Sequence, residues 1–294
     1  ACAAPGGAVE RVIGAGFPGG LDEAPSLVLA GVERLDPAAH RYLEDHRLAG
    51  QPVLPVAMQI ESAAAAVLRA HPGAAIAAIE GYRLLQGVKV EGPTPLAIFV
   101  DPHAGGRIDV ELRGPGGRPH ARCTVVVGAP APLRPLVDCG DLAPRREDGA
   151  AIYANRRLFH GPRFHALEAL EAIGPAGVAA ILRTDPRDFF AAERALHTAP
   201  LALDGAFQAA VLWCRDALGA PSLPSRLGAW RFAAPLPARV RAVGAVRAVE
   251  GLTATLDFDL LDEGGVVVAQ VEGYVCTASP GLEAAYGAAG SEAA

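Results

Sequence analysis

The stretch PVAMQIESAAAAVLRAHPG, residues 55–73, contains the first of two long apolar helices that decide the fold. Pro55 suits the start of a helix, where its missing amide N–H is not needed, and the breakers His71-Pro72-Gly73 end the pattern. Nearly every side of this helix is apolar, so other parts of the chain must cover it all round. A curved sheet that closes around the helix would provide that cover.

The segments that follow this helix have the composition and length of β-strands. Gly114-Pro115-Gly116-Gly117 is typical of a hairpin loop between two of them. The predicted strands of this half cover residues 75–90, 96–101, 107–113 and 120–128.

The second half of the chain repeats this order. Pro200 opens the apolar segment LALDGAFQAAVLWCRDALG, which Gly219 ends as a C-terminal cap. Strand-like segments follow at residues 227–232, 239–249, 253–261 and 266–276. The sequence therefore predicts an α+β structure made of two repeats, each a helix wrapped by an antiparallel sheet. An ordinary pair of α+β domains, with each helix on one sheet face, is the alternative that periodicity leaves open.

Gly-, Ala- and Pro-rich stretches set the expected domain boundaries. Because the chain begins with Ala1, we expect a piece excised from a longer polypeptide. The expected parts are an N-terminal linker (1–20), a first repeat (21–135), an inter-repeat linker (136–150), a second repeat (151–279) and a C-terminal tail (280–294).

Composition excludes several classes of function. The 294 residues carry a net charge of −6, and the bases are spread along the chain, so neither nucleic acid nor a membrane surface is an expected partner. The sequence has no uninterrupted run of about 18 apolar residues, so we expect no membrane-spanning helix. Five widely spaced cysteines without a CxxC pair favour a reduced, cytoplasmic protein without a structural zinc site.

Two short motifs carry the candidate chemistry. His46, Gly50 and Pro55 form the pattern HxxxGxxxxP, which predicts a histidine at a strand end, a glycine turn and a helix N-terminus with free N–H groups. Asp204 and Gln208 lie one helical turn apart in the second apolar helix. Burial should raise the pKa of Asp204 toward a proton-donating form, although a helix N-cap role is the structural alternative for this residue.

These motifs resemble the dehydratase domains of modular polyketide synthases and of polyunsaturated fatty acid synthases, which carry HxxxGxxxxP in one half and DxxxQ or DxxxH in the other. Three weaker matches occur in the same order: Tyr153, the segment 158–164 (LFHGPRF) in place of YGPxF, and the Leu-Pro pair at 223–224. The resemblance spans roughly residues 25 to 277. The residues around the motifs resemble the polyunsaturated fatty acid and related iterative synthases more than the ordinary modular polyketide synthases.

The resemblance implies a double hot-dog fold and dehydration of a β-hydroxyacyl thioester on acyl carrier protein, without a metal or another cofactor. It implies that His46 is the base and Asp204 the acid. Neighbouring synthase domains, and a second copy of the chain in a homodimer, are the other implied partners. The remaining implied site residues bind the substrate or orient the catalytic groups: Gln208, the backbone N–H near Val56, Gly50, Pro55, Tyr153, His160, Gly161 and Pro162.

Two departures from the family pattern keep other hypotheses open. His160 replaces the tyrosine of YGPxF, and Val56 stands where a glycine often follows the proline. A dehydratase-like domain that has lost turnover and serves a structural or acyl-binding role is therefore the second hypothesis. A hot-dog thioesterase is the third. His160 and His165 suggest a metal pair, but no third ligand is readable, so we predict no metal site.

Overall fold

The computed structural model describes residues 27–103, 105–138, 142–233 and 235–287, so the linker predicted at 1–20 lies outside the described residues. Helix α1 (Val56–Ala70) and helix α3 (Pro200–Ala217) begin where the sequence predicts. Residues 56–67 of α1 and 200–214 of α3 are all buried. Both helices are therefore covered on every side, which a single sheet face would not achieve.

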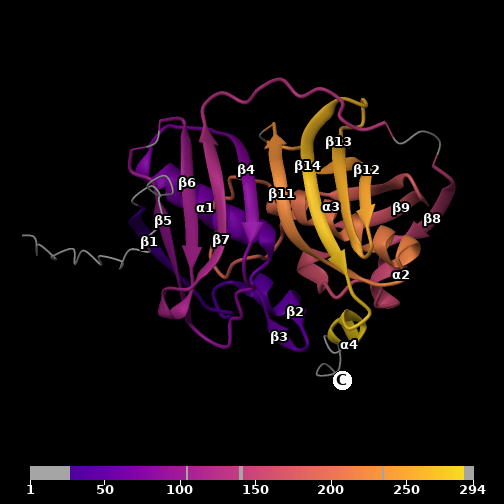
Figure 1. Cartoon of the computed structure of the whole chain (residues 1–294), viewed down its shortest axis with the longest axis horizontal. Helices are drawn as coiled ribbons and strands as arrows, with labels where there is room; N and C mark the ends of the chain where they lie inside the picture. Colours follow the sequence, from indigo (N-terminus) through magenta and orange to yellow (C-terminus); the bar gives the residue numbers. More distant parts are fainter. Residues whose placement is uncertain (1–26, 104, 139–141, 234, 288–294) are drawn as a thin grey trace, which may run out of the picture.

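Four antiparallel strands follow each helix, which confirms the predicted repeat (Figure 1). In the first repeat these are β4 (Ile76–Leu84), β5 (Thr94–Val100), β6 (Arg107–Arg113) and β7 (Pro119–Val127), with a short 3-10 turn (Pro115–Gly117) in the predicted hairpin loop. In the second repeat they are β11 (Ser222–Phe232), β12 (Arg239–Glu250), β13 (Thr253–Leu261) and β14 (Val267–Ala278).

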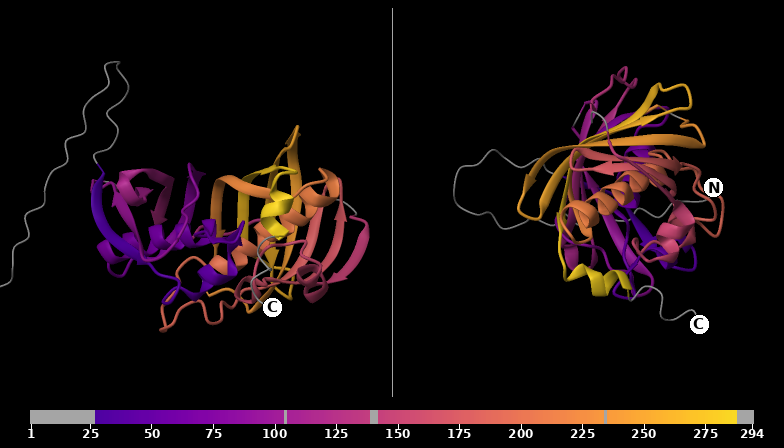
Figure 2. Two further views of the ribbon diagram at one scale, coloured as in Figure 1. Left: turned by 90° about the horizontal axis from the view of Figure 1, so that it is seen from below. Right: turned by 90° about the vertical axis from the view of Figure 1, so that its right-hand side faces the viewer.

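The two repeats join through one continuous sheet of 12 strands, in the order β1-β5-β6-β7-β4-β11-β14-β13-β12-β10-β9-β8. The strand that follows each helix lies at the junction, where β4 pairs with β11 in the antiparallel direction. Counted outward from the junction, the strands of the first repeat lie in the order β4, β7, β6, β5, and those of the second repeat in the order β11, β14, β13, β12. Each repeat therefore places its first strand after the helix at the junction, followed by its fourth, third and second. The sheet curves around both helices, and α1 contacts α3 (Figure 2).

Several elements were not predicted. The edge strand β1 (Val28–Leu35) precedes α1, and β9 (Leu167–Gly174) and β10 (Gly177–Arg183) precede α3. Alanine occupies several positions of β9 and β10 (LEALEAIG and GVAAILR), and alanine has a low preference for strands, so their alternation is weak.

The predicted linker and tail also contain regular structure. Strand β8 (Pro144–Asp148) and helix α2 (Gly149–Ala154) begin inside the predicted linker 136–150. Asp148 caps α2 by accepting hydrogen bonds from the backbone N–H groups of Ala150 and Ala151, a local signal that the prolines of this stretch obscured. Helix α4 (Leu282–Gly287) lies in the predicted tail, and its Tyr286 is buried.

No helix among the described residues has the length and apolar character needed to cross a membrane. The described cysteines Cys123, Cys214 and Cys276 are buried free thiols, whereas Cys2 and Cys139 lie outside the described residues.

Candidate active site

A cavity of about 160 Å³ lies between the two repeats, and its wall is mostly apolar. Both repeats line it: Leu54 and Val56 come from the first, Phe207 and Tyr274 from the second, and Tyr286 comes from α4. Of the predicted site residues, His46, Val56, His160, Asp204 and Gln208 line the cavity, whereas Gly50, Pro55, Tyr153, Gly161 and Pro162 do not.

His46 follows a 3-10 helix (Arg41–Asp45) rather than ending a strand, which corrects the prediction. A short hairpin, β2 (Arg47–Leu48) with β3 (Gln51–Pro52), then turns the chain toward α1. Its two-residue loop has positive φ at both positions, 50° at Ala49 and 76° at Gly50, which favours glycine. Gly50 therefore shapes the turn, as predicted from the motif.

The imidazole of His46 has a fixed orientation and tautomer. Its Nδ1 lies 2.7 Å from the carbonyl oxygen of Val53, and this oxygen can only accept, so Nδ1 carries the proton. The backbone N–H of Val53 in turn donates to the carbonyl of His46 at 2.9 Å. Burial lowers the pKa of His46 from 6.5 to about 4, so Nε2 is unprotonated at neutral pH and can act as a base.

Asp204 is the fifth residue of α3, and Ala199 is the N-cap, so the N-cap alternative for Asp204 is wrong. Burial raises the pKa of its carboxyl from 3.8 to about 7. The side-chain amide of Gln208 donates to Asp204 Oδ2 at 2.7 Å, which leaves Oδ1 to carry the acidic proton. A carboxyl held partly protonated at neutral pH can act as a general acid.

Tyr153 holds Gln208 in turn. Its hydroxyl donates to Gln208 Oε1 at 2.6 Å and accepts from the backbone N–H of Leu167 at 2.9 Å. The amide of Gln208 also donates to the carbonyl of Phe164 at 2.8 Å. Tyr153 therefore contacts the Asp204 carboxyl only through Gln208, and it does not line the cavity.

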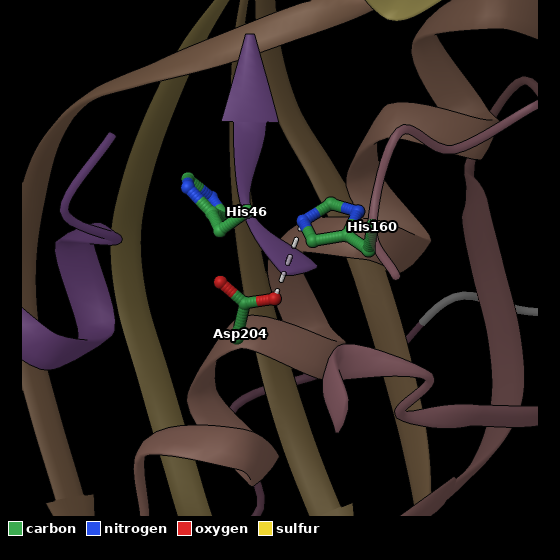
Figure 3. Close-up of side chains that lie close together, drawn as sticks. All are labelled: His46, His160 and Asp204. Carbon is green, nitrogen blue, oxygen red and sulfur yellow. Dashed lines mark ion pairs between the residues drawn. The ribbon is translucent and has the colours of Figure 1, made fainter. Parts of the chain in front are cut away.

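His160 completes a cluster with His46 and Asp204, as Figure 3 shows. Its Nε2 lies 3.4 Å from Asp204 Oδ2, and its ring centroid lies 5.4 Å from that of His46. Burial and the nearby His46 and His165 hold its pKa well below the ordinary value, so the ring is neutral. One donor atom from each of His46, His160 and Asp204 lies within 4.8 Å of the other two. These three are therefore the described residues that could hold a metal ion here.

Gly161 and Pro162 act on His46 through its neighbour Asp45. The N–H of Gly161 donates to the Asp45 carbonyl at 2.7 Å, and a Cβ on Gly161 would lie 2.3 Å from Asp45 Oδ1. Pro162 opens a 3-10 turn (Pro162–Phe164), where Arg163 binds the Asp45 carboxylate through its backbone N–H at 3.1 Å and its guanidinium at 2.7 Å. The motif of the second repeat thus fixes His46 of the first.

Val56 is the first residue of α1, and Pro55 is its N-cap. No acceptor among the described residues binds the backbone N–H of Val56, which is expected in the first turn of a helix. Because Val56 also lines the cavity, this N–H is available to an oxygen atom of a bound molecule.

Glu61, which sequence reasoning left without a role, anchors the segment that precedes α3. Its buried carboxylate accepts hydrogen bonds from the backbone N–H of His197 and from both the N–H and the hydroxyl of Thr198, at 2.6 to 3.0 Å. The next residue, Ala199, has a left-handed φ of 48°, and Pro200 follows. Glu61 on α1 thus fixes the start of the helix that carries Asp204.

The two repeats contribute different groups at equivalent positions. Counted from the proline that opens each helix, Asp204 and Gln59 are both the fourth residue on. Gln59 lines the same cavity and accepts a hydrogen bond from the hydroxyl of Tyr82 at 2.9 Å. The first repeat therefore has an amide where the second has the Asp204 carboxyl, so the two halves of the cavity are chemically different.

Comparisons with known proteins agree with this geometry. Two family models match, "Polyketide synthase dehydratase domain" over residues 28–114 and "Polyketide synthase dehydratase N-terminal domain" over residues 141–285. One subunit of the polyunsaturated fatty acid synthase of Thraustochytrium sp. is 30% identical over 209 residues, which are 66% of this chain and 7% of that protein. The chain thus corresponds to one domain of a multidomain synthase and spans a small fraction of this relative.

Solved dehydratase domains have the same fold. The dehydratase domain of PpsC from Mycobacterium tuberculosis, in complex with C12:1-CoA, is 26% identical with a TM-score of 0.70, and the match covers 84% of this chain and 92% of that one. A trans-AT polyketide synthase dehydratase domain from Brevibacillus brevis is 22% identical with a TM-score of 0.70, covering 84% and 93%. The double hot-dog prediction is confirmed, and the chain belongs to the polyketide synthase dehydratase family.

Proposed function

We propose that this domain removes water from a β-hydroxyacyl thioester and gives the α,β-enoyl thioester. One observation carries the proposal: an unprotonated imidazole and a partly protonated carboxyl, from different repeats, lie within 4.8 Å of each other in one apolar cavity. Elimination of water needs such a pair, because the α-proton is weakly acidic and hydroxide is a poor leaving group. Apolar walls also keep bulk water from the reacting atoms.

In the proposed mechanism, Nε2 of His46 takes the α-proton, and the electrons of that C–H bond form the new carbon–carbon double bond. The β-carbon–oxygen bond breaks as Asp204 Oδ1 gives its proton to the departing hydroxyl, which leaves as water. The N–H of Val56 stabilises the thioester oxygen while it carries partial negative charge. Transfer of the proton from His46 back to Asp204, directly or through water, restores both groups.

His160 is proposed to bind the β-hydroxyl or to orient Asp204, in the place where the family has a tyrosine. Its Nε2 lies 3.4 Å from Asp204 Oδ2, and its ring stacks on Phe159 with centroids 4.0 Å apart. A neutral imidazole can donate one hydrogen bond, as a phenol does. The structure of the site therefore supports an active dehydratase more than the inactive alternative.

Acyl carrier protein is the proposed carrier of the substrate, and a row of arginines supports this partner. Arg83 on β4 pairs in register with Arg226 on β11 and with Arg122 on β7. Arg122 is already paired with Glu111, whereas Arg83 and Arg226 are exposed and neither has a salt bridge within the described part of the chain. Like charges directly opposite each other on adjacent strands are unfavourable, so an acidic partner would stabilise them.

This arginine row lies close to the cavity in sequence. Leu84 follows Arg83, Pro224 lies two residues before Arg226, and both line the cavity, as does the exposed Gly87. By contrast, the arginine clusters at 145–146 and 156–157 include Arg145 and Arg157, which are already paired with acids of this chain. We therefore place the carrier at the strand ends of the junction.

A second copy of the chain is a further proposed partner. Strand β1 forms one edge of the sheet and exposes Val28, Leu29 and Val32 by 46, 55 and 58%. An apolar edge strand is a common surface for association.

We also propose that the protein is located in the cytoplasm. This location is supported by Cys214 and Cys276, whose Sγ atoms lie 3.6 Å apart as free thiols.

The test is to incubate the domain with a β-hydroxyacyl thioester of N-acetylcysteamine and to follow the loss of water by mass spectrometry. Turnover in the wild type that falls at least about 100-fold in both His46→Ala and Asp204→Asn supports the proposal. His71→Ala, a change of an exposed histidine, is the matched control and should keep turnover. No turnover in a folded wild type that still binds acyl chains supports the inactive alternative, and release of free acid supports a thioesterase.

A further inference from the structure

We propose that His46, His160 and Asp204 form a binding site for one zinc ion, and that its occupation blocks dehydration. The zinc site rests on geometry alone, whereas the inhibition rests on the function proposed above. The sequence predicted no metal site, because no third ligand could be read beside the pair His160 and His165. The structure instead places His160 beside two residues that lie far from it in the sequence.

The donor atoms nearly match a zinc polyhedron. Zinc binds imidazole nitrogen and carboxylate oxygen at about 2.0 to 2.1 Å in a tetrahedron, so adjacent donors lie roughly 3.3 Å apart. His160 Nε2 and Asp204 Oδ2 are already 3.4 Å apart. All three donors lie within 4.8 Å of one another, so shifts of about 1 Å, within the reach of small side-chain rotations, complete the set.

The groups behind two of the ligands have the arrangement of a metal site. A zinc-bound histidine commonly donates its other ring N–H to a carbonyl or carboxylate, and ligating carboxylates are themselves hydrogen-bonded. Nδ1 of His46 donates to the Val53 carbonyl, which directs the Nε2 lone pair away from that bond. Gln208 holds Asp204 in the same way. Two ligands are therefore oriented before any ion arrives.

His160 supplies the third ligand. Its side chain is 5% exposed, and no partner among the described residues binds its Nδ1, so metal binding at Nε2, which requires the ring proton on Nδ1, breaks no hydrogen bond of Nδ1. Two imidazoles and one carboxylate are a donor set that suits zinc, and three protein ligands leave a fourth position for water. The tyrosine that the family pattern has at this position would offer a protonated phenol instead.

Occupation of the site removes both catalytic groups. The Nε2 lone pair of His46 would bind the metal instead of the α-proton, and the carboxyl of Asp204 would have no proton to give. Zinc should therefore inhibit without unfolding the domain. The inhibition should be reversed when a chelator removes the ion.

The binding test is isothermal titration calorimetry of zinc chloride into the metal-free 294-residue chain, together with the visible absorption spectrum of the cobalt(II) form. We expect one equivalent bound, and at least about a tenfold loss of affinity in His160→Phe and in Asp204→Asn. His71→Ala should bind as the wild type does. Thermal unfolding of each metal-free variant shows that it is folded.

Equal zinc affinity in wild type and folded His160→Phe, or weak binding of several equivalents, would overturn the site. The inhibition test adds zinc to the N-acetylcysteamine assay and then adds EDTA, and turnover should fall and recover. Full turnover with one zinc bound would overturn the inhibition. A wild type that binds one zinc but never dehydrates would contradict the proposed function and leave the zinc site standing.

Discussion

Replacement of Asp204 by asparagine should change how stability depends on pH. Burial raises the pKa of this carboxyl from 3.8 to about 7, so between these values the folded protein holds a proton that the unfolded chain releases. Stability from this group is complete below pH 4 and is lost as the pH rises through 7. Asparagine cannot titrate, and it can still accept the hydrogen bond from Gln208, so the variant lacks this dependence.

The size of the effect follows from the two pKa values. Each unit of difference is worth about 1.4 kcal/mol, so between pH 5 and pH 8 the wild type should lose about 2.5 kcal/mol relative to the variant. His46 acts in the opposite direction, because its pKa falls from 6.5 to about 4 and its burial is less unfavourable as the pH rises through this range. The wild-type curve alone would therefore conceal the contribution of Asp204.

Urea unfolding at several pH values, for wild type and Asp204→Asn side by side, measures the difference. The His46 contribution is common to both proteins and cancels. A difference that stays constant within about 0.5 kcal/mol from pH 5 to pH 8 would show that the folded protein does not hold Asp204 protonated, and the general acid would lose its physical basis.

Two further substitutions test groups that do not line the cavity. Tyr153→Phe leaves the Leu167 N–H and the Gln208 side-chain carbonyl without their partner, so urea unfolding should show a loss of about 2 kcal/mol. In addition, kcat should fall more than KM rises. Unchanged stability and kcat would contradict the role of Tyr153 in holding Gln208 against Asp204. Gly161→Ala places a methyl group against Asp45 and should cost about 1 to 3 kcal/mol together with turnover. A Gly161→Ala variant with full activity would show that this contact does not position the histidine.

The sequence predicted the parts of the fold that depend on local patterns. Both long helices stand out because apolar residues occupy every side of them, and Pro55 and Pro200 mark their starts. Strands β9 and β10 were missed because alanine takes positions where valine or isoleucine would show the alternation. The helix at 282–287 was missed because its main anchor, the burial of Tyr286, is a contact with distant residues.

In the candidate site, too, the sequence predicted the features that depend on local patterns and missed those that depend on contacts between distant segments. The motifs predicted roles for His46, Asp204 and Gln208, because each motif lies within one short segment of the chain: 46–55 for His46, and helix α3 for Asp204 and Gln208. They did not reveal that Asp45 links Gly161 to His46, or that Glu61 anchors the start of α3, because these contacts join segments about 120 to 140 residues apart in the chain. The cluster of His46, His160 and Asp204 is likewise a product of the fold.

The pH dependence of kcat/KM for a β-hydroxyacyl thioester tests most directly the central proposal, in which His46 is the base and Asp204 is the acid. With the base free above about pH 4 and the acid protonated below about pH 7, kcat/KM should be highest between these values and fall tenfold per unit above pH 7. At pH 9 the rate should be about 100-fold below its maximum, and Asp204→Asn should lack this decline. A wild-type kcat/KM that stays level or rises from pH 7 to pH 9 would contradict the assignment of Asp204 as the acid.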